Sequence, residues 1–203
     1  MKKLASTLPN MLLSLGAVTI VAGALLGAMY SVTKGPIEEA AGRQLTEAIA
    51  EVTPPFNNNP EADKVEITVD GLSFALYPAY EDGRLVGAAV TGVSMDGFSG
   101  EIDILCGFCF DGSVKDYRVL SHAETPGLGA KMEMWFRDPS GARSVLGRSP
   151  GSERFAVTKD GGAVDAITAA TISSRAFLDV MRSAYMAYRE YALGEGVTIA
   201  PAM

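Results

Sequence analysis

Hydroxyl-bearing and small residues gather in residues 165–174, which read Asp-Ala-Ile-Thr-Ala-Ala-Thr-Ile-Ser-Ser. This block comes directly before a segment with helical periodicity, so it leads into a helix N-terminus. The free backbone N–H groups and the positive dipole end of a helix attract phosphate there. The residues that can donate hydrogen bonds or leave room for a bulky group are Thr168, Ala169, Ala170, Ser173 and Ser174. The block predicts a phosphate-binding site, and it leaves open an ordinary helix cap made by Ser173 or Ser174.

The pattern Asp-x-x-Thr-x-Ala-Thr followed by Ser-Ser resembles the flavinylation motif of the FMN-binding domain family. The resemblance implies that a phosphoester bond joins FMN to Thr171 and that a flavin transferase makes this bond from FAD. It also implies that the transferase recognises Asp165, Thr168 and Thr171. The family often has Ser-Gly where this chain has Thr168-Ala169, and we expect both replacements to be conservative.

A second block, residues 121–129, reads Ser-His-Ala-Glu-Thr-Pro-Gly-Leu-Gly. It resembles the loop of the same family that packs against the isoalloxazine ring of the flavin. Gly127 and Gly129 permit a close approach of the backbone to a flat ring, and Leu128 offers an apolar surface. Together the two blocks imply one cofactor site, made of Glu124, Thr125, Gly127, Leu128, Gly129, Thr168, Ala169, Ala170, Ser173 and Ser174.

Four other residues are candidates for chemistry. Cys106 and Cys109 lie three apart on an expected strand and therefore face opposite sides, which disfavours a disulfide between them. We expect buried packing residues, with a redox pair or half of an inter-subunit Fe–S site as the alternatives. His122 is expected to be a hydrogen-bonding loop residue, although a flavin contact or a proton relay stays open. Trp135 is expected in the core rather than stacked on a flavin.

Composition excludes several classes of protein. The 203 residues contain 17 Lys and Arg against 24 Asp and Glu, which gives a net charge of −7. The basic residues are scattered, so we expect no nucleic-acid partner. Two cysteines and one histidine cannot build a disulfide framework or a self-contained metal site. No plausible Ser/His/Asp or Cys/His set is visible, so we predict no catalytic residue and no metal ligand.

Residues 11–30 form an apolar run long enough to cross a membrane as a helix. Lys2 and Lys3 precede it and Lys34 follows it, so the positive-inside rule places residues 1–10 in the cytoplasm and the remainder outside. The expected location is therefore the inner (cytoplasmic) membrane, with a single pass and a periplasmic or otherwise extracytoplasmic domain. A cleaved signal peptide is the alternative.

The remaining sequence predicts an α+β fold, one β-sheet flanked by helices. Residues 31–60 form a helical stalk and linker, with a helix over 35–52 and a loop over 53–60, and residues 61–203 form the domain that binds FMN covalently. Alternating patterns predict strands at residues 65–69, 72–80, 84–93, 101–110 and 113–120. Asp-Gly turns separate several of these strands, and Gly97 and Gly100 indicate a tight bend. Short and long helices are expected at residues 131–137 and 174–193.

The two blocks and the anchor together resemble the G subunits of Rnf complexes, which are ion-pumping ferredoxin:NAD⁺ oxidoreductases, and the related C subunits of Na⁺-pumping NADH:quinone reductases. The resemblance implies a redox subunit that is not autonomous, that transfers electrons through covalent FMN, and that has other membrane and peripheral subunits as partners. A stand-alone flavinylated reductase that faces outward is one alternative. The other is a membrane-anchored assembly module without redox function, in which Thr171 is only a helix cap.

Overall fold

The computed structural model of the chain describes residues 7–203, apart from the side chains of residues 38, 39 and 41. Lys2 and Lys3, on which the expected orientation depends, lie outside the described residues, as does part of the expected cytoplasmic segment 1–10. The chain divides into two compact units, Met1–Leu45 and Thr46–Met203.

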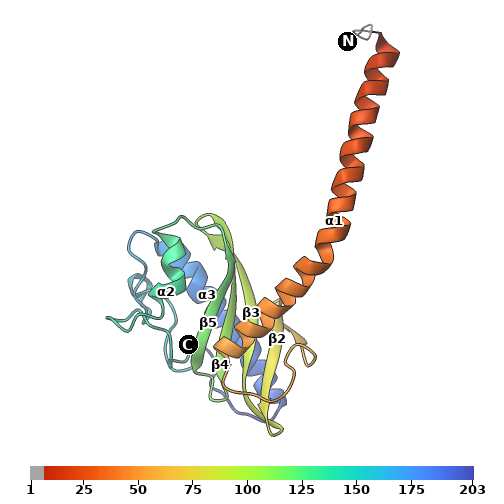
Figure 1. Cartoon of the computed structure of the whole chain (residues 1–203). Coiled ribbons are helices and arrows are strands. Elements are labelled where there is room, and N and C mark those ends of the chain that lie inside the picture. The colour runs from red at the N-terminus through yellow and green to blue at the C-terminus, as the bar shows by residue number, and fades with distance from the viewer. Residues whose placement is uncertain (1–6) are drawn as a thin grey trace. The chain divides into compact units, whose positions relative to one another are not determined.

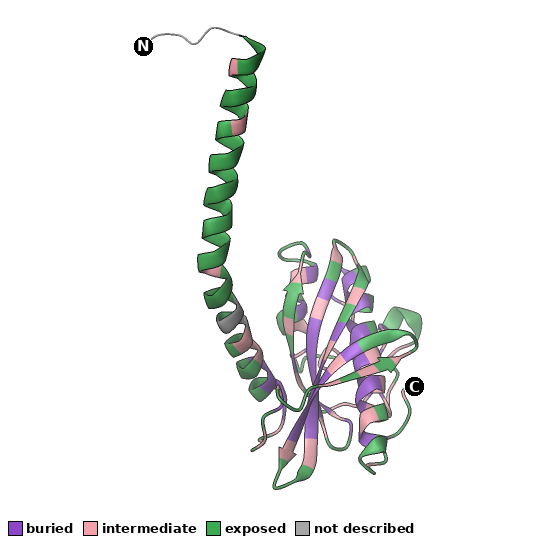
Figure 2. Ribbon diagram, turned by 90° about the vertical axis from the view of Figure 1, so that its right-hand side faces the viewer, coloured by how far each residue is buried: buried purple, intermediate pink, exposed green. Residues whose placement is uncertain are grey.

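Helix α1 runs over Leu8–Val52 and contains Pro36. The sequence predicts a transmembrane helix over residues 11–30 and a separate helix over residues 35–52, whereas the structure has one continuous helix through Pro36. The residue before a proline is disfavoured in the helical region partly through its Cβ atom, and Gly35 has none. The apolar part of α1 has a mean hydropathy of 2.1 and none of it is buried, as the exposed colouring of the helix in Figure 2 shows. It is a single transmembrane helix by its length and composition.

The second unit is built on a five-stranded antiparallel sheet whose strands follow one another in chain order. These strands are β1 (Val65–Val69), β2 (Leu72–Glu81), β3 (Arg84–Gly97), β4 (Gly100–Cys109) and β5 (Val114–His122). Asp70-Gly71 and Asp82-Gly83 adopt positive φ angles at the two expected hairpin turns. β3 extends four residues beyond its predicted end at residue 93, so Gly97 pairs with Gly100 and residues 98 and 99 form the hairpin tip.

The sheet is covered on both faces, as Figure 1 shows for the second unit. Helix α3 (Thr171–Gly194) packs against the face that carries Leu76, Val90 and Ile104, and this face holds the main core. The last turns of α1 cover the opposite face. Ala48, Ile49 and Val52 are buried there, and a Cβ atom at Gly107 would collide with the Val52 backbone. The α+β fold predicted from the sequence is confirmed.

Shorter elements connect β5 to α3. They are η1 (Gly129–Lys131), α2 (Met132–Trp135) and η2 (Thr158–Asp160), with one isolated parallel bridge between Val157 and Val164. The helix expected over residues 131–137 is therefore shorter, and α3 begins three residues earlier than residue 174. Cys106 is fully buried in the core and Cys109 is partly exposed, and both are free thiols. The burial of Cys106 in the core confirms its expected packing role and raises the pKa of its thiol. The expectation of a buried residue is wrong for Cys109, which lies at the end of β4.

Candidate functional site

Thr171 is the first residue of α3, and a strained turn delivers it there. Ala169 has φ +61°, and Ala170 leaves this turn with φ −135°. A left-handed conformation costs an alanine about 1–2 kcal/mol, whereas glycine adopts it freely. The expectation that Ala169 is a conservative replacement for the family's glycine is therefore wrong, because this position demands a positive φ.

Ser173 and Ser174 do not cap α3, so that alternative is wrong. No side chain makes a capping hydrogen bond at Ala170, the residue that precedes the helix. The Ser174 hydroxyl donates to the Ala170 carbonyl (2.9 Å) and accepts from the Ile167 N–H (2.9 Å). Ser174 is fully buried behind the turn, whereas Ser173 faces the cavity described next.

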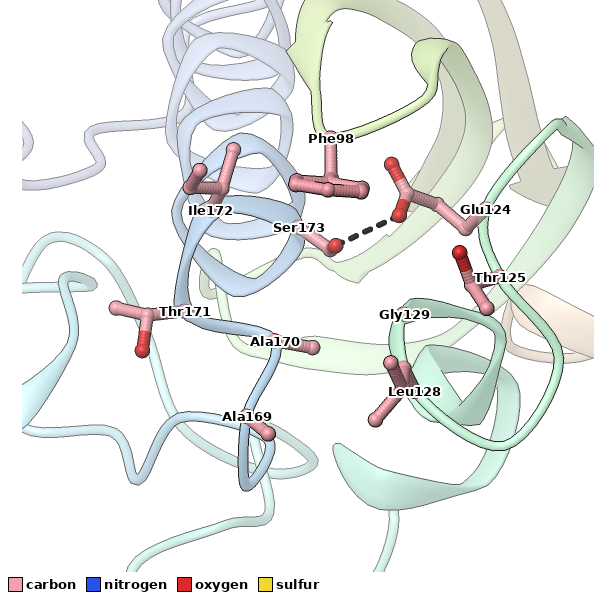
Figure 3. A pocket seen from close by; sticks show the side chains of 10 residues that line it. All are labelled: Phe98, Glu124, Thr125, Leu128, Gly129, Ala169, Ala170, Thr171, Ile172 and Ser173. Atoms are coloured by element: carbon pink, nitrogen blue, oxygen red, sulfur yellow. Dashed lines mark hydrogen bonds between the residues drawn. The ribbon is translucent and has the colours of Figure 1, made fainter.

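A cavity of about 310 Å³ lies where the two sequence blocks meet (Figure 3). The β3–β4 hairpin, the loop after β5 and the first turn of α3 form its walls. Its lining residues are Phe98, Glu124, Thr125, Leu128, Gly129, Ala169, Ala170, Thr171, Ile172 and Ser173. Eight of these ten were predicted from the sequence, so the fold brings both blocks into one site. Gly127, Thr168 and Ser174 do not line it.

Glu124 connects three segments at this cavity. Its side chain is buried (5% exposed), and Oε1 accepts from the Ser99 N–H (3.1 Å) while Oε2 accepts from the Ser173 hydroxyl (2.8 Å). The second bond is the dashed line in Figure 3. The Glu124 N–H donates to His122 Nδ1 (3.1 Å). Glu124 therefore fixes the hairpin tip, its own loop and α3 relative to one another.

The two loop glycines are each required by the fold of the loop itself. A Cβ atom at Gly129 would collide with Glu124 Oε2 and lie 2.6 Å from Ser173 Oγ. Gly129 thus leaves room for the Glu124–Ser173 hydrogen bond. Gly127 has φ +77° and no atom near the position of a Cβ, so the turn itself requires glycine there.

Phe98 and Ile172 line the cavity and were missed from the sequence. Phe98 lies at the hairpin tip and is 68% exposed, and Ile172 and Leu128 are also exposed. An aromatic flanked by Gly97 and Gly100 at a hairpin tip is the signal that was available for Phe98. Apolar walls with a few polar groups are typical of sites for flat aromatic ligands, and such pockets start at about 300 Å³. The residues present therefore fit an isoalloxazine ring.

A second cavity, of about 390 Å³, lies beside Thr171. In Figure 3 the Thr171 side chain points away from Phe98, Glu124 and Leu128. The lining residues of the second cavity are Trp135, Arg143, Thr158, Lys159, Asp165, Ala166, Ile167, Thr168, Ala169 and Thr171. Thr171 and Ala169 thus border both cavities, and Asp165 and Thr168 border only the second.

Asp165 stabilises the loop that follows α2. Its Oδ2 accepts from the Ala142 N–H (3.1 Å), and its carbonyl accepts from Trp135 Nε1 (2.9 Å). Trp135 is only partly buried, and the Arg143 guanidinium stacks on its ring at 4.1 Å. Trp135 packs against the edge of the core and borders the second cavity rather than the first.

His122 lies outside both cavities. Its Nδ1 accepts from the Glu124 backbone and its Nε2 is 3.6 Å from Glu133 Oε1. The expected hydrogen bonding is confirmed, but His122 is the last residue of β5 and not a loop residue. Among the side chains that the structure describes, no three from His, Cys, Asp or Glu lie close enough together to hold a metal ion.

Comparisons with known proteins agree with this geometry. Residues 97–186 match the family described as FMN-binding domain, and the match covers both blocks and the hairpin tip. The G subunit of the ion-translocating oxidoreductase complex of Aliivibrio fischeri (strain MJ11) is 34% identical over 196 residues, which cover 92% of each chain. The protein of the same name from Erwinia tasmaniensis is 35% identical over 179 residues, which cover 83% of this chain and 84% of the relative. A third, from Yersinia pestis, is 34% identical and covers 79% of this chain and 80% of its own length. By its identity to these relatives over most of its length, this chain belongs to the family of G subunits of ion-translocating oxidoreductase complexes.

Proposed function

We propose that the chain carries FMN covalently on Thr171 and transfers electrons within a membrane-bound ion-translocating ferredoxin:NAD⁺ oxidoreductase. Its place among membrane-associated electron-transfer subunits with an FMN-binding domain follows from its family. The position of Thr171 is the single observation that supports covalent attachment of FMN at this residue. This residue borders both cavities, is partly exposed, and makes no side-chain hydrogen bond with the described chain.

Attachment would be a phosphoryl transfer from FAD. The Thr171 hydroxyl oxygen forms a bond to the phosphorus of the FMN half while the bond from that phosphorus to the AMP oxygen breaks. AMP leaves, and the hydroxyl proton passes to a base or to water. A separate flavin transferase would supply this chemistry, because the described chain has no residue set suited to it near Thr171.

The bound flavin would supply reversible electron transfer, which needs no nucleophile or acid–base pair from the protein. Phe98, Leu128 and Ile172 would hold the ring by apolar contact. Glu124 would act through the segments that it joins, because both of its carboxylate oxygens already accept hydrogen bonds from the protein. It would keep the hairpin tip at a fixed distance from α3 and would therefore keep the cavity open to a flat ring.

The transmembrane helix would keep the flavin near the partner subunits. We propose that the residues after the apolar run 11–30 lie on the extracytoplasmic side, as the lysines on either side of that run predict. A phosphoester bond would then retain the cofactor where no free flavin pool is available. Partners would be the other membrane and peripheral subunits of the complex, and the flavin transferase during maturation.

Fluorescence of denaturing gels tests the attachment. The full chain is produced together with a flavin transferase as wild type, Thr171→Ala, Thr171→Ser and Thr198→Ala. Thr198 is the matched control, since it is an exposed threonine that lines neither cavity. A flavin band is expected for wild type and Thr198→Ala, a band also for Thr171→Ser, and none for Thr171→Ala. A band of wild-type intensity in Thr171→Ala would refute attachment at this residue.

A further inference from the structure

The two cavities that share Thr171 differ in charge. Glu124 is the one charged residue that lines the first cavity within residues 7–203, and it is buried. The second cavity is lined by Arg143, Lys159 and Asp165, which together carry one net positive charge. An anion placed in the first cavity would face a carboxylate, and one placed in the second would face two cations. Charge therefore separates the places suited to a neutral ring and to a phosphate.

Lys159 is the more available of the two cations. It is exposed and has no hydrogen bond or ion pair with any described residue. Lysine is a common phosphate ligand because its ammonium is a compact charge with three donors. Its neighbour Thr158 also lines the cavity and adds a hydroxyl donor.

Arg143 is held in place but is not saturated. Its Nη1 lies 2.6 Å from Asp138 Oδ2, and its guanidinium stacks on Trp135 at 4.1 Å. A guanidinium has five N–H donors, so donors are left for a ligand in the cavity. The carboxylate on the same wall is engaged, because Asp165 Oδ2 accepts from the Ala142 N–H.

The Thr171 side chain points away from Phe98, Glu124 and Leu128, the residues that face the first cavity (Figure 3). A phosphate esterified to its hydroxyl would therefore start on the side of the second cavity. We propose that the second cavity is the phosphate subsite of the FMN site, with Lys159 and Arg143 as counterions of the phosphate group, while the ring lies in the first cavity. This inference rests on the proposed function and adds two residues that neither sequence block contains.

The test uses the full chain in mild detergent as Thr171→Ala, without a flavin transferase, so that flavins bind reversibly. FMN and riboflavin are titrated by their fluorescence, because they differ only in the phosphate. An exposed charge pair is worth up to about 1 kcal/mol, or about fivefold in affinity. We expect FMN to bind about fivefold to twentyfold more tightly than riboflavin, and inorganic phosphate to compete with FMN only.

Lys159→Gln is then added to Thr171→Ala, and it should weaken FMN about threefold to fivefold and leave riboflavin unchanged. Arg143→Gln should act in the same direction. Lys115→Gln is the matched control, since Lys115 is exposed on β5 and lines neither cavity. Equal affinities for FMN and riboflavin, or equal losses for both flavins in Lys159→Gln, would overturn the phosphate subsite.

The two proposals fail in different ways. If riboflavin and FMN bind equally and wild type is still flavinylated, the phosphate subsite is refuted and the proposed function stands. If neither flavin binds and wild type acquires no FMN beside the transferase, the proposed function itself is refuted. If neither binds but wild type is flavinylated, the loaded and unloaded chains are melted at low and high salt. Covalent FMN should then raise the melting temperature of wild type more at low salt than at high salt, and Lys159→Gln should remove this salt dependence. A salt dependence that is absent in wild type, or unchanged in Lys159→Gln, would overturn the phosphate subsite.

Discussion

Replacing Gly129 by alanine tests the connection that Glu124 makes between the hairpin tip and α3. The added methyl group would collide with Glu124 Oε2 and lie 2.6 Å from Ser173 Oγ and 3.0 Å from Glu124 Cβ. Its φ angle is not in the left-handed region, so the cost is steric rather than conformational. The methyl group can be accommodated only if the Glu124 side chain moves away from Ser173.

The loss of stability expected for Gly129→Ala has two causes, and both arise from the same shift of the Glu124 side chain. An added methylene in a packed site costs about 1–3 kcal/mol. A hydrogen bond to a charged group is worth about 1.5–3 kcal/mol. Because one shift of Glu124 relieves the collision and breaks the bond, the two effects do not add in full. We expect Gly129→Ala to lower the free energy of unfolding by about 2–3 kcal/mol.

The assay is urea unfolding of the full chain in mild detergent, followed by the fluorescence of Trp135, the only tryptophan. Gly194→Ala is the control, because a Cβ atom there meets nothing within 4 Å. The same Gly129→Ala change is also made in Glu124→Ala, where its cost should fall below about 1 kcal/mol. A cost under about 0.5 kcal/mol in wild type, or the same cost in both backgrounds, would refute the role assigned to Glu124 and Gly129.

Three further predictions concern the turn, the ring contact and pH. Ala169→Gly should raise the free energy of unfolding by about 0.5–1 kcal/mol, because relief of the positive φ outweighs the added chain entropy; a decrease in the same urea assay would contradict this. Phe98→Ala in the Thr171→Ala chain should weaken riboflavin about threefold to tenfold, the loss of about 0.5–1.5 kcal/mol of stacking, and unchanged binding would remove Phe98 from the site. The Arg175 guanidinium lies 2.7 Å from Asp160 and lowers the pKa of that carboxyl. The ion pair therefore stabilises the fold above a pH of about 4. This stabilisation is lost as the pH falls through the lowered pKa. The melting temperature of wild type should therefore exceed that of Asp160→Asn by a constant amount from pH 7 to pH 5, and the difference should shrink below pH 4; a difference that grows in acid would contradict the assignment.

Local patterns were sufficient to predict much of the fold. The Asp70-Gly71 and Asp82-Gly83 turns fix their hairpins because the required positive φ angles are properties of these residue pairs. Alternation of apolar residues then predicts which strands exist. The start of α3 was predicted at residue 174, three residues later than its observed start at Thr171. The left-handed turn at Ala169 instead delivers the chain into the helix at Thr171, and Ser173 and Ser174 are used in tertiary contacts.

Only the site residues that belong to one of the two contiguous sequence motifs were predicted. Phe98 was not predicted as a site residue, because its position depends on a long-range hydrogen bond. This bond joins the Ser99 N–H to Glu124, 25 residues away. Lys159 and Arg143 were not predicted either, because they come close to Thr171 only through the packing of η2 and of the loop after α2. The role of Gly129 could not be predicted either, because the atoms that its side chain would displace belong to Glu124 and to α3.

The mass of the native chain tests the central claim most directly. The full chain is purified from its own membrane, its intact mass is measured, and the peptide that contains residues 165–175 is fragmented. We predict an increase equal to FMN minus one water, with the modification confined to Thr171. A chain whose mass is that of the polypeptide alone, or a flavin attached to any other residue of that peptide, would contradict covalent attachment at Thr171.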